Sequence, residues 1–241
     1  MGQRFLISIL KHAVKNQLMI RNVSEARELP KDKKQEAKAF TEKETNCFLK
    51  AMKGDRLKAA FVVLLGTGLR RGELLALKWQ NVDLKEKTIA VKERLAWVTK
   101  KGFDWDLPKT DKSRRVVPLP DNVATELKKH KAKQAEEKLK LGELYQENSL
   151  VFATEQGTPI NPRNFERKYK TLLKKTGLVS INLHVLRHTY ATRLLEAGIN
   201  LKVVQKLMGH SRISTTADTY SHVSPELKHS AVSKLNGLFT L

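Results

Sequence analysis

One stretch of β-type sequence interrupts a chain whose other patterned segments are all helical. Residues 88–119 contain short runs rich in Val, Ile, Thr and Trp, separated by Lys-Gly and Thr-Asp-Lys turns. Elsewhere apolar residues recur at helical spacing, most clearly from Leu57 to Leu65. The pattern predicts a mainly α fold with one small antiparallel sheet, which belongs to the α+β class.

A charged segment with little periodicity, residues 24–40, divides the chain and is typical of a linker. Residues 1–23 before it contain one amphipathic helix, which we expect to end by about Leu18. A single helix cannot bury its own apolar stripe, so it either folds back on the main domain or is the C-terminal remnant of a further domain, and we favour the remnant. Residues 41–241 then form the main domain, which begins at Thr41 with a T-x-x-E capping pattern.

The charge of the chain indicates the class of its partner. Its 46 Lys and Arg residues outnumber 25 Asp and Glu residues, which gives a formal charge of +21. Such a surplus favours a polyanion, and nucleic acid is the first partner to expect. The apolar run from Phe5 to Leu10 is too short for a signal peptide or membrane span. We therefore expect a cytoplasmic protein with no membrane partner, and a reduced Cys47 that fills a small place in the core.

Candidate catalytic side chains lie near the ends of predicted helices. Arg70 follows Gly66-Thr67-Gly68 at a turn-to-helix junction. His184 and Arg187 are three residues apart, on one face of a helix that we expect Asn182 to cap. Each pattern alone is weak, since a histidine and an arginine on a helix are usually solvated and Arg70 has a ready ion-pair partner in Glu73.

Four segments taken together are far more specific than any of these patterns. TGLRRGELLAL, PKTDKSRRVVPL, HVLRHTYATRLLEAG and LMGHSRISTTADTYSHV occur in this order. In this respect the sequence resembles the tyrosine recombinases, also called the phage integrase family, over about residues 41–235. The GHSRISTTADTYSHV segment is most similar to integrases of phages and conjugative elements of Gram-positive bacteria. The resemblance also implies that residues 1–23 are the end of a core-binding domain.

The resemblance implies a role for six residues, position by position. Arg70 matches the first catalytic arginine, Lys109 the lysine of the sheet turn, and His184 with Arg187 the H-x-x-R pair. His210 matches the last His or Trp, and Tyr220 the nucleophile. Lys112 is a rival to Lys109, and the ten positions from His210 to Tyr220 are one more than in many members.

The chemistry of these residue types fits cleavage of a phosphodiester. Guanidinium groups match phosphate geometry and keep their charge, so Arg70 and Arg187 would hold the phosphate while His210 donates a further hydrogen bond. His184 is the candidate base for the phenol of Tyr220, and Lys109 the candidate acid for the leaving 5′ oxygen. No metal-ligand pattern is present in the sequence, so we expect neither metal nor cofactor.

The leading hypothesis is a site-specific DNA recombinase that works through a 3′-phosphotyrosine. The resemblance implies double-stranded attachment sites and a homotetramer on DNA, with accessory DNA-bending or excision factors as possible partners. Two alternatives stay open: a DNA-relaxing enzyme of the type IB topoisomerase class, and a non-catalytic DNA-binding relic of an integrase.

Overall fold

A computed structural model describes residues 2–22, 39–106, 114–178 and 181–210 of the chain. The chain divides into two compact units, residues 1–36 and 37–241. In the first unit, α1 (Gly2–Lys15) is an amphipathic helix that leaves Leu6 and Ile9 exposed. It ends three residues before the predicted position. In the described part of the chain, no helix is both long enough and apolar enough to cross a bilayer.

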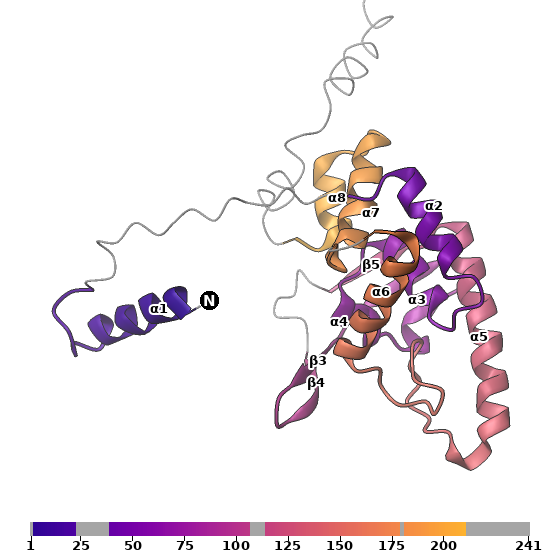
Figure 1. Ribbon diagram of the computed structural model, residues 1–241, viewed down its shortest axis with the longest axis horizontal. Helices are drawn as coiled ribbons and strands as arrows, with labels where there is room; N and C mark the ends of the chain where they lie inside the picture. Colours follow the sequence, from indigo (N-terminus) through magenta and orange to yellow (C-terminus); the bar gives the residue numbers. More distant parts are fainter. Residues whose placement is uncertain (1, 23–38, 107–113, 179–180, 211–241) are drawn as a thin grey trace, which may run out of the picture. The chain divides into compact units, whose positions relative to one another are not determined.

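The second unit is mainly helical, as the sequence predicts (Figure 1). Thr41 begins the first of its helices with the predicted capping box, in which Glu44 N donates to Thr41 Oγ1 and Thr41 N donates to Glu44 Oε2. The helices are α2 (Glu42–Ala51), α3 (Lys58–Thr67), α4 (Arg71–Leu75), α5 (Asp121–Leu141), α6 (Pro162–Thr176), α7 (His184–Glu196) and α8 (Leu201–Met208). Short 3-10 turns lie at Trp79–Asn81 and Gly142–Leu144.

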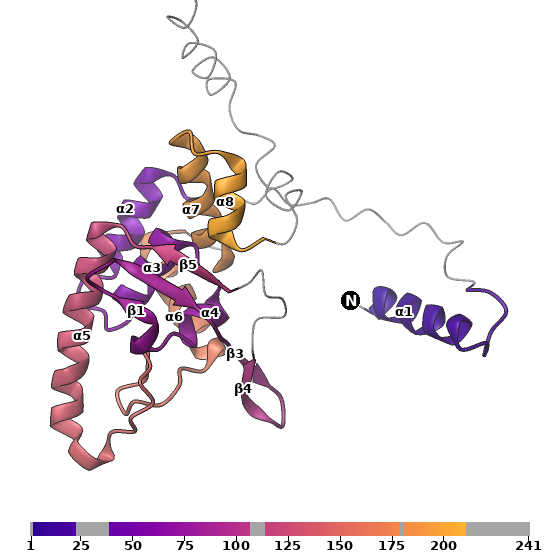
Figure 2. The ribbon, with the colours of Figure 1, turned by 180° about the vertical axis from the view of Figure 1, so that it is seen from behind.

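The β-type stretch forms two antiparallel sheets where one was predicted (Figure 2). In the first, β2 (Thr88–Val91) lies between β1 (Val82–Asp83) and β5 (Arg115–Pro118). The second is the hairpin of β3 (Arg94–Val98) and β4 (Gly102–Asp106). Alternation along a strand shows which face is buried but not which strand pairs with which, so the sequence predicted strands and missed the division between sheets.

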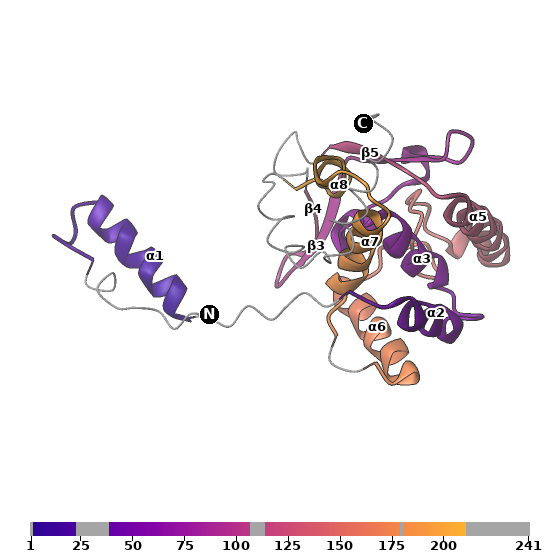
Figure 3. The same cartoon turned by 90° about the horizontal axis from the view of Figure 1, so that it is seen from above.

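An aromatic cluster joins α2, α3 and α6 in the core. The ring of Phe61 lies 5.7 Å from that of Phe48 and 4.8 Å from that of Phe165, measured between centroids. Helix α3 also contacts α5 and α7 (Figure 3), so it is the central helix of this unit. The prediction for Cys47 was wrong: its side chain is exposed, because the buried face of α2 is formed by its neighbour Phe48.

Candidate active site

Arg70 lies between two helices, at the junction that the sequence predicts. Gly68 ends α3 in the left-handed conformation, with φ of 62°, and Arg70 is the extended N-cap of α4. The Arg70 backbone N–H donates to Glu73 Oε2 over 2.9 Å, and Arg70 Nη1 donates to Glu73 Oε1 over 2.9 Å. The side chain of Arg70 is 40% exposed. Both ends of this residue are thus fixed while its guanidinium still reaches solvent.

His184 is the first residue of α7, and Arg187 follows about one turn later. The predicted cap was wrong, because Leu183 is the N-cap and makes no side-chain cap bond, while the backbone oxygen of Asn182 accepts from Val185 N. Farther along, Thr189 accepts a hydrogen bond from Phe40 N over 2.9 Å. Helix α7 is therefore tied to the residues that precede α2.

Arg187 is buried, with 2% of its surface exposed, and joins two distant backbone segments. Its Nη1 donates to the carbonyl oxygen of Gly68 and its Nη2 to that of Met208. A Cβ on Gly68 would lie 2.4 Å from Cδ1 of Tyr190, so a larger residue there would push α3 away from α7. Arg187 therefore links the end of α3 to the end of α8.

The described candidate residues converge on one region. A pocket of about 370 Å³ is lined by Arg70, Arg71, His184 and Arg187, with Glu166 on α6 also at its wall. His210 directly follows Gly209, whose carbonyl oxygen accepts from Arg70 Nη2 over 3.0 Å. Four of the six predicted residues, Arg70, His184, Arg187 and His210, are thus brought together from segments far apart in the sequence.

Burial, together with the positive charge of this region, keeps the histidines neutral near pH 7. Burial, followed in order of importance by the charges of His188, Arg187 and Arg70, lowers the pKa of His184 to about 4. Burial also lowers the pKa of His210 to about 4, with Arg187 and Arg70 as the next causes. The ring of His188 lies edge-on to that of His184, 4.7 Å between centroids. Near pH 7 a neutral imidazole is available to accept a proton.

Arg115 belongs to this region and was missed by the sequence analysis. It is the first residue of β5, and its side chain is 7% exposed. Its Nη2 donates to Glu73 Oε2 over 2.8 Å, and its Nε donates to the carbonyl oxygen of Leu207 over 2.8 Å. The motif SRRVVPL contained the signal, since an arginine at the start of a half-buried strand needs a buried partner.

Glu73 is the structural partner of a neighbouring arginine and a backbone amide, as the sequence predicts. Burial raises the pKa of Glu73, but the hydrogen bond and charge of Arg115, followed by those of Arg70, more than offset it and lower the pKa to about 2. Lys109, its rival Lys112 and Tyr220 lie outside the described residues.

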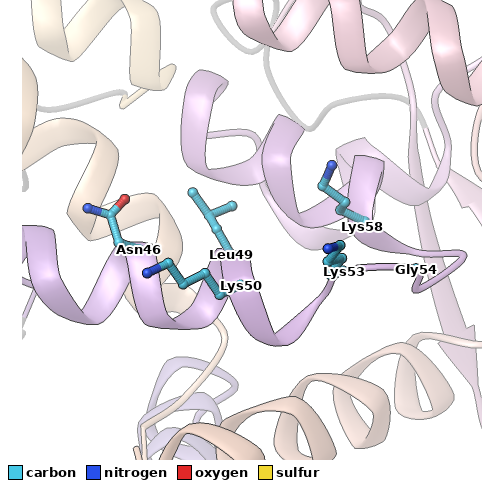
Figure 4. A pocket seen from close by; sticks show the side chains of 6 residues that line it. All are labelled: Asn46, Leu49, Lys50, Lys53, Gly54 and Lys58. Atoms are coloured by element: carbon cyan, nitrogen blue, oxygen red, sulfur yellow. The ribbon is translucent and has the colours of Figure 1, made fainter.

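Two of the other tyrosines are accounted for by packing. Tyr169 is fully buried in the aromatic cluster and Tyr190 is half-buried against α8. A separate hollow of about 400 Å³ lies beside α2 and the start of α3, where Lys50, Lys53 and Lys58 surround it (Figure 4). None of the four candidate catalytic residues that the structure describes lines it. Among the described residues, no group of three or more His, Cys, Asp or Glu side chains is placed to hold a metal ion.

Comparison with known proteins agrees with the motifs. The model of the phage integrase family matches residues 38–226. A XerC-like tyrosine recombinase of Caldanaerobacter subterraneus is 40% identical, over 98% of this chain and 64% of the relative. The ICEBs1 integrase of Bacillus subtilis is 30% identical, over 97% of this chain and 63% of the relative. The chain thus spans a little under two thirds of the length of these curated relatives.

A solved structure has the same fold. The Tn1549 transposon integrase in complex with transposon right end DNA superposes with a TM-score of 0.81 at 25% identity, covering 97% of this chain and 78% of that one. The sequence motifs, the convergence of Arg70 with Arg187 and these similarities agree: the chain belongs to the phage integrase family, whose members include the tyrosine recombinases.

Proposed function

We propose that this chain cleaves and rejoins DNA strands at specific sites through a 3′-phosphotyrosine. One observation carries the proposal: Arg70 and Arg187, from different helices, line one pocket and both bind the backbone just before His210. Two guanidinium groups at one pocket suit a phosphodiester, whose nonbridging oxygens gain negative charge in the transition state.

The proposed reaction conserves the energy of the phosphodiester. The phenol oxygen of Tyr220 attacks phosphorus as His184 takes its proton, the bond to the 5′ oxygen breaks, and Lys109 protonates that oxygen. A 5′-hydroxyl of another strand then attacks the phosphotyrosine and reverses the steps. Neutral His184, whose pKa is lowered to about 4, is in the right protonation state to act as the base near pH 7.

We further propose double-stranded DNA as the substrate. The charge of +21 supplies many phosphate contacts that read no sequence, so binding should weaken steeply with salt. The Tn1549 integrase complex supports this partner, since that relative holds DNA of its transposon end. The same proposal includes a homotetramer on paired sites and accessory DNA-bending factors. It also divides the chain into a core-binding remnant (1–23), a linker (24–40) and a catalytic domain (41–241).

Trapping of the covalent adduct tests the proposal without knowledge of the attachment site. The substrate is a pool of duplexes that carry a nick within randomised sequence. After cleavage the short strand with the 5′-hydroxyl dissociates, so the adduct cannot reverse. We expect a DNA adduct that survives denaturation and maps to Tyr220 by mass spectrometry. Tyr220→Phe should abolish it, whereas Tyr145→Phe, at a tyrosine outside the motifs, should not.

Two outcomes would contradict this function. Tight DNA binding with no adduct would indicate a non-catalytic DNA-binding protein. An adduct that shows no preferred sequence, together with relaxation of any supercoiled plasmid, would indicate a topoisomerase.

A further inference from the structure

Three arginines meet at the C-terminal end of α8, and only two of them belong to the proposed phosphate site. Leu207 O accepts from Arg115 Nε over 2.8 Å, Met208 O accepts from Arg187 Nη2, and Gly209 O accepts from Arg70 Nη2 over 3.0 Å. Backbone carbonyls at the end of a helix lack intrahelical partners and carry partial negative charge. Each of these three successive carbonyls is therefore satisfied by a different guanidinium, directly before His210.

Arg115 also shares a carboxylate with Arg70. Glu73 Oε1 accepts from Arg70 Nη1 over 2.9 Å and from Arg115 Nη1 over 3.2 Å, while Glu73 Oε2 accepts from the Arg70 backbone N–H and from Arg115 Nη2. The side chains of Glu73 and Arg115 are 8% and 7% exposed, so water screens their charges little. Two guanidinium groups thus divide one negative charge.

This division has a consequence for phosphate binding. Arg70 and Arg115 together with Glu73 carry one net positive charge, and Arg187 adds a second. If Arg115 were absent, Glu73 would neutralise Arg70 alone, and the attraction of Arg70 for a phosphate oxygen would fall. Arg115 itself does not line the pocket, so it acts through its neighbours.

The contact with α8 is close because residue 209 is glycine. Gly209 has φ of 62°, and a Cβ there would lie 2.9 Å from Arg115 Nη1. The guanidinium of Arg115 therefore lies against the peptide that leads into His210. Any shift of Arg115 would move the end of α8 relative to Arg70.

We propose that Arg115 is a positioning residue for strand cleavage, which leaves Arg70 partly uncompensated by Glu73 and fixes the backbone before His210. This inference rests on the proposed function. It predicts that the contribution of Arg115 to the rate of cleavage depends on its charge. If Arg115 only filled space, its contribution to that rate would not depend on the charge of Glu73.

Single-turnover adduct formation on the nicked duplex pool, after selection of the preferred sequence, tests the inference. We expect Arg115→Met to slow adduct formation about 100-fold, by analogy with loss of one transition-state donor, and to change DNA affinity by less than about threefold. The double variant Arg115→Met, Glu73→Gln should recover about tenfold of that rate, because it restores one net positive charge at Arg70.

Arg56→Met is the matched control. Arg56 also pairs with a glutamate through two nitrogens, at 2.9 and 2.7 Å from Glu137, and donates to the carbonyl oxygen of Ala153 over 2.6 Å. Arg56 does not line the candidate pocket, and Arg56→Met should lose comparable packing without slowing adduct formation.

Wild-type protein is assayed first, so the two proposals fail separately. No adduct in the wild type would remove the proposed function. An adduct that Arg115→Met forms at the wild-type rate, or a double variant no faster than Arg115→Met, would overturn only the role of Arg115. If Arg115→Met does not fold, Arg115→Lys keeps the charge without the planar fork. It should slow the adduct about tenfold, and a wild-type rate would overturn the inference.

Discussion

Arg56 and Arg115 make nearly the same contacts in two different settings. Each binds a glutamate with two nitrogens and a backbone carbonyl with a third. Glu137 pairs with Arg56, so that network is electrically balanced, and beside it His130 Nε2 on α5 donates to Val151 O over 2.7 Å. Glu73 is instead divided between two arginines, with Arg187 close by.

The difference separates a structural network from a site for an anion. The balanced pair of Arg56 and Glu137 joins α5 to the residues around Ala153, and its charges cancel without a further ion. An excess of guanidinium charge is unfavourable to assemble and is relieved when an anion binds. The region around Glu73 is therefore where we propose that a phosphate binds. The network of Arg56 and Glu137 serves as its control.

The largest expected effect is at Arg187. Arg187→Lys keeps one positive charge but cannot bridge Gly68 O and Met208 O while also facing the pocket. We expect adduct formation to fall about 1000-fold. The corresponding change in the balanced network, Arg56→Lys, should leave the rate unchanged. A fall of less than about tenfold for Arg187→Lys would contradict the assignment.

The two glutamates should differ in their effect on stability. Glu73→Gln removes a buried charge that lies between the buried guanidinium of Arg115 and the half-exposed guanidinium of Arg70, so we expect the free energy of unfolding to fall by about 3 kcal/mol. Glu137→Gln affects a pair whose side chains are each 19% exposed and should cost about 1 kcal/mol. Urea unfolding followed by circular dichroism measures both. Equal losses in the free energy of unfolding would contradict the distinction between a charge-balanced network and one with excess positive charge.

Local parts of the fold were predictable from the sequence. The capping box of Thr41 with Glu44 depends on neighbouring residues, and the structure confirms it. The exposure of Cys47 and the division of the strands into two sheets depend on which elements pack together. Periodicity in one segment does not contain that information.

The same limit applies to the site. Arg70, His184, Arg187 and His210 could be named because their motifs resemble a known family, and each was placed near the end of an element. Nothing in the separate segments showed that Arg115 would meet Glu73 and the end of α8. The partner of a buried arginine is set by tertiary packing. Sequence reasoning therefore named Arg70, His184 and Arg187, which line the pocket, and missed Arg115, which does not.

Histidine titration should also distinguish the two networks. We expect NMR titration midpoints near pH 4 for His184 and His210, and both should rise in Arg70→Gln because a nearby positive charge is removed. The pKa of His130 is lowered mainly by its burial, with Arg56 among the smaller causes, so its midpoint should not respond to Arg70→Gln. Unchanged midpoints for His184 and His210 would show that the charge of Arg70 does not contribute to their lowered pKa values.

The same shifts predict how stability depends on pH. Between about pH 6.5 and 4 the unfolded chain binds protons that these folded histidines do not, so the free energy of unfolding should fall as the pH decreases through this window. Glu73, with a pKa of about 2, should lose its contribution only at lower pH.

The smallest expected effect concerns the glycine against Arg115. Gly209 and Gly177 both have left-handed backbone, with φ of 62° and 72°, so alanine at either position should cost about 1 kcal/mol in the free energy of unfolding. Nothing lies within 4 Å of a Cβ on Gly177, whereas a Cβ on Gly209 would press on Arg115. Gly209→Ala should therefore slow adduct formation several-fold, and Gly177→Ala should not. Equal rates of adduct formation in the two variants would show that Arg115 can be displaced without effect. Its position against the backbone before His210 would then not matter for cleavage.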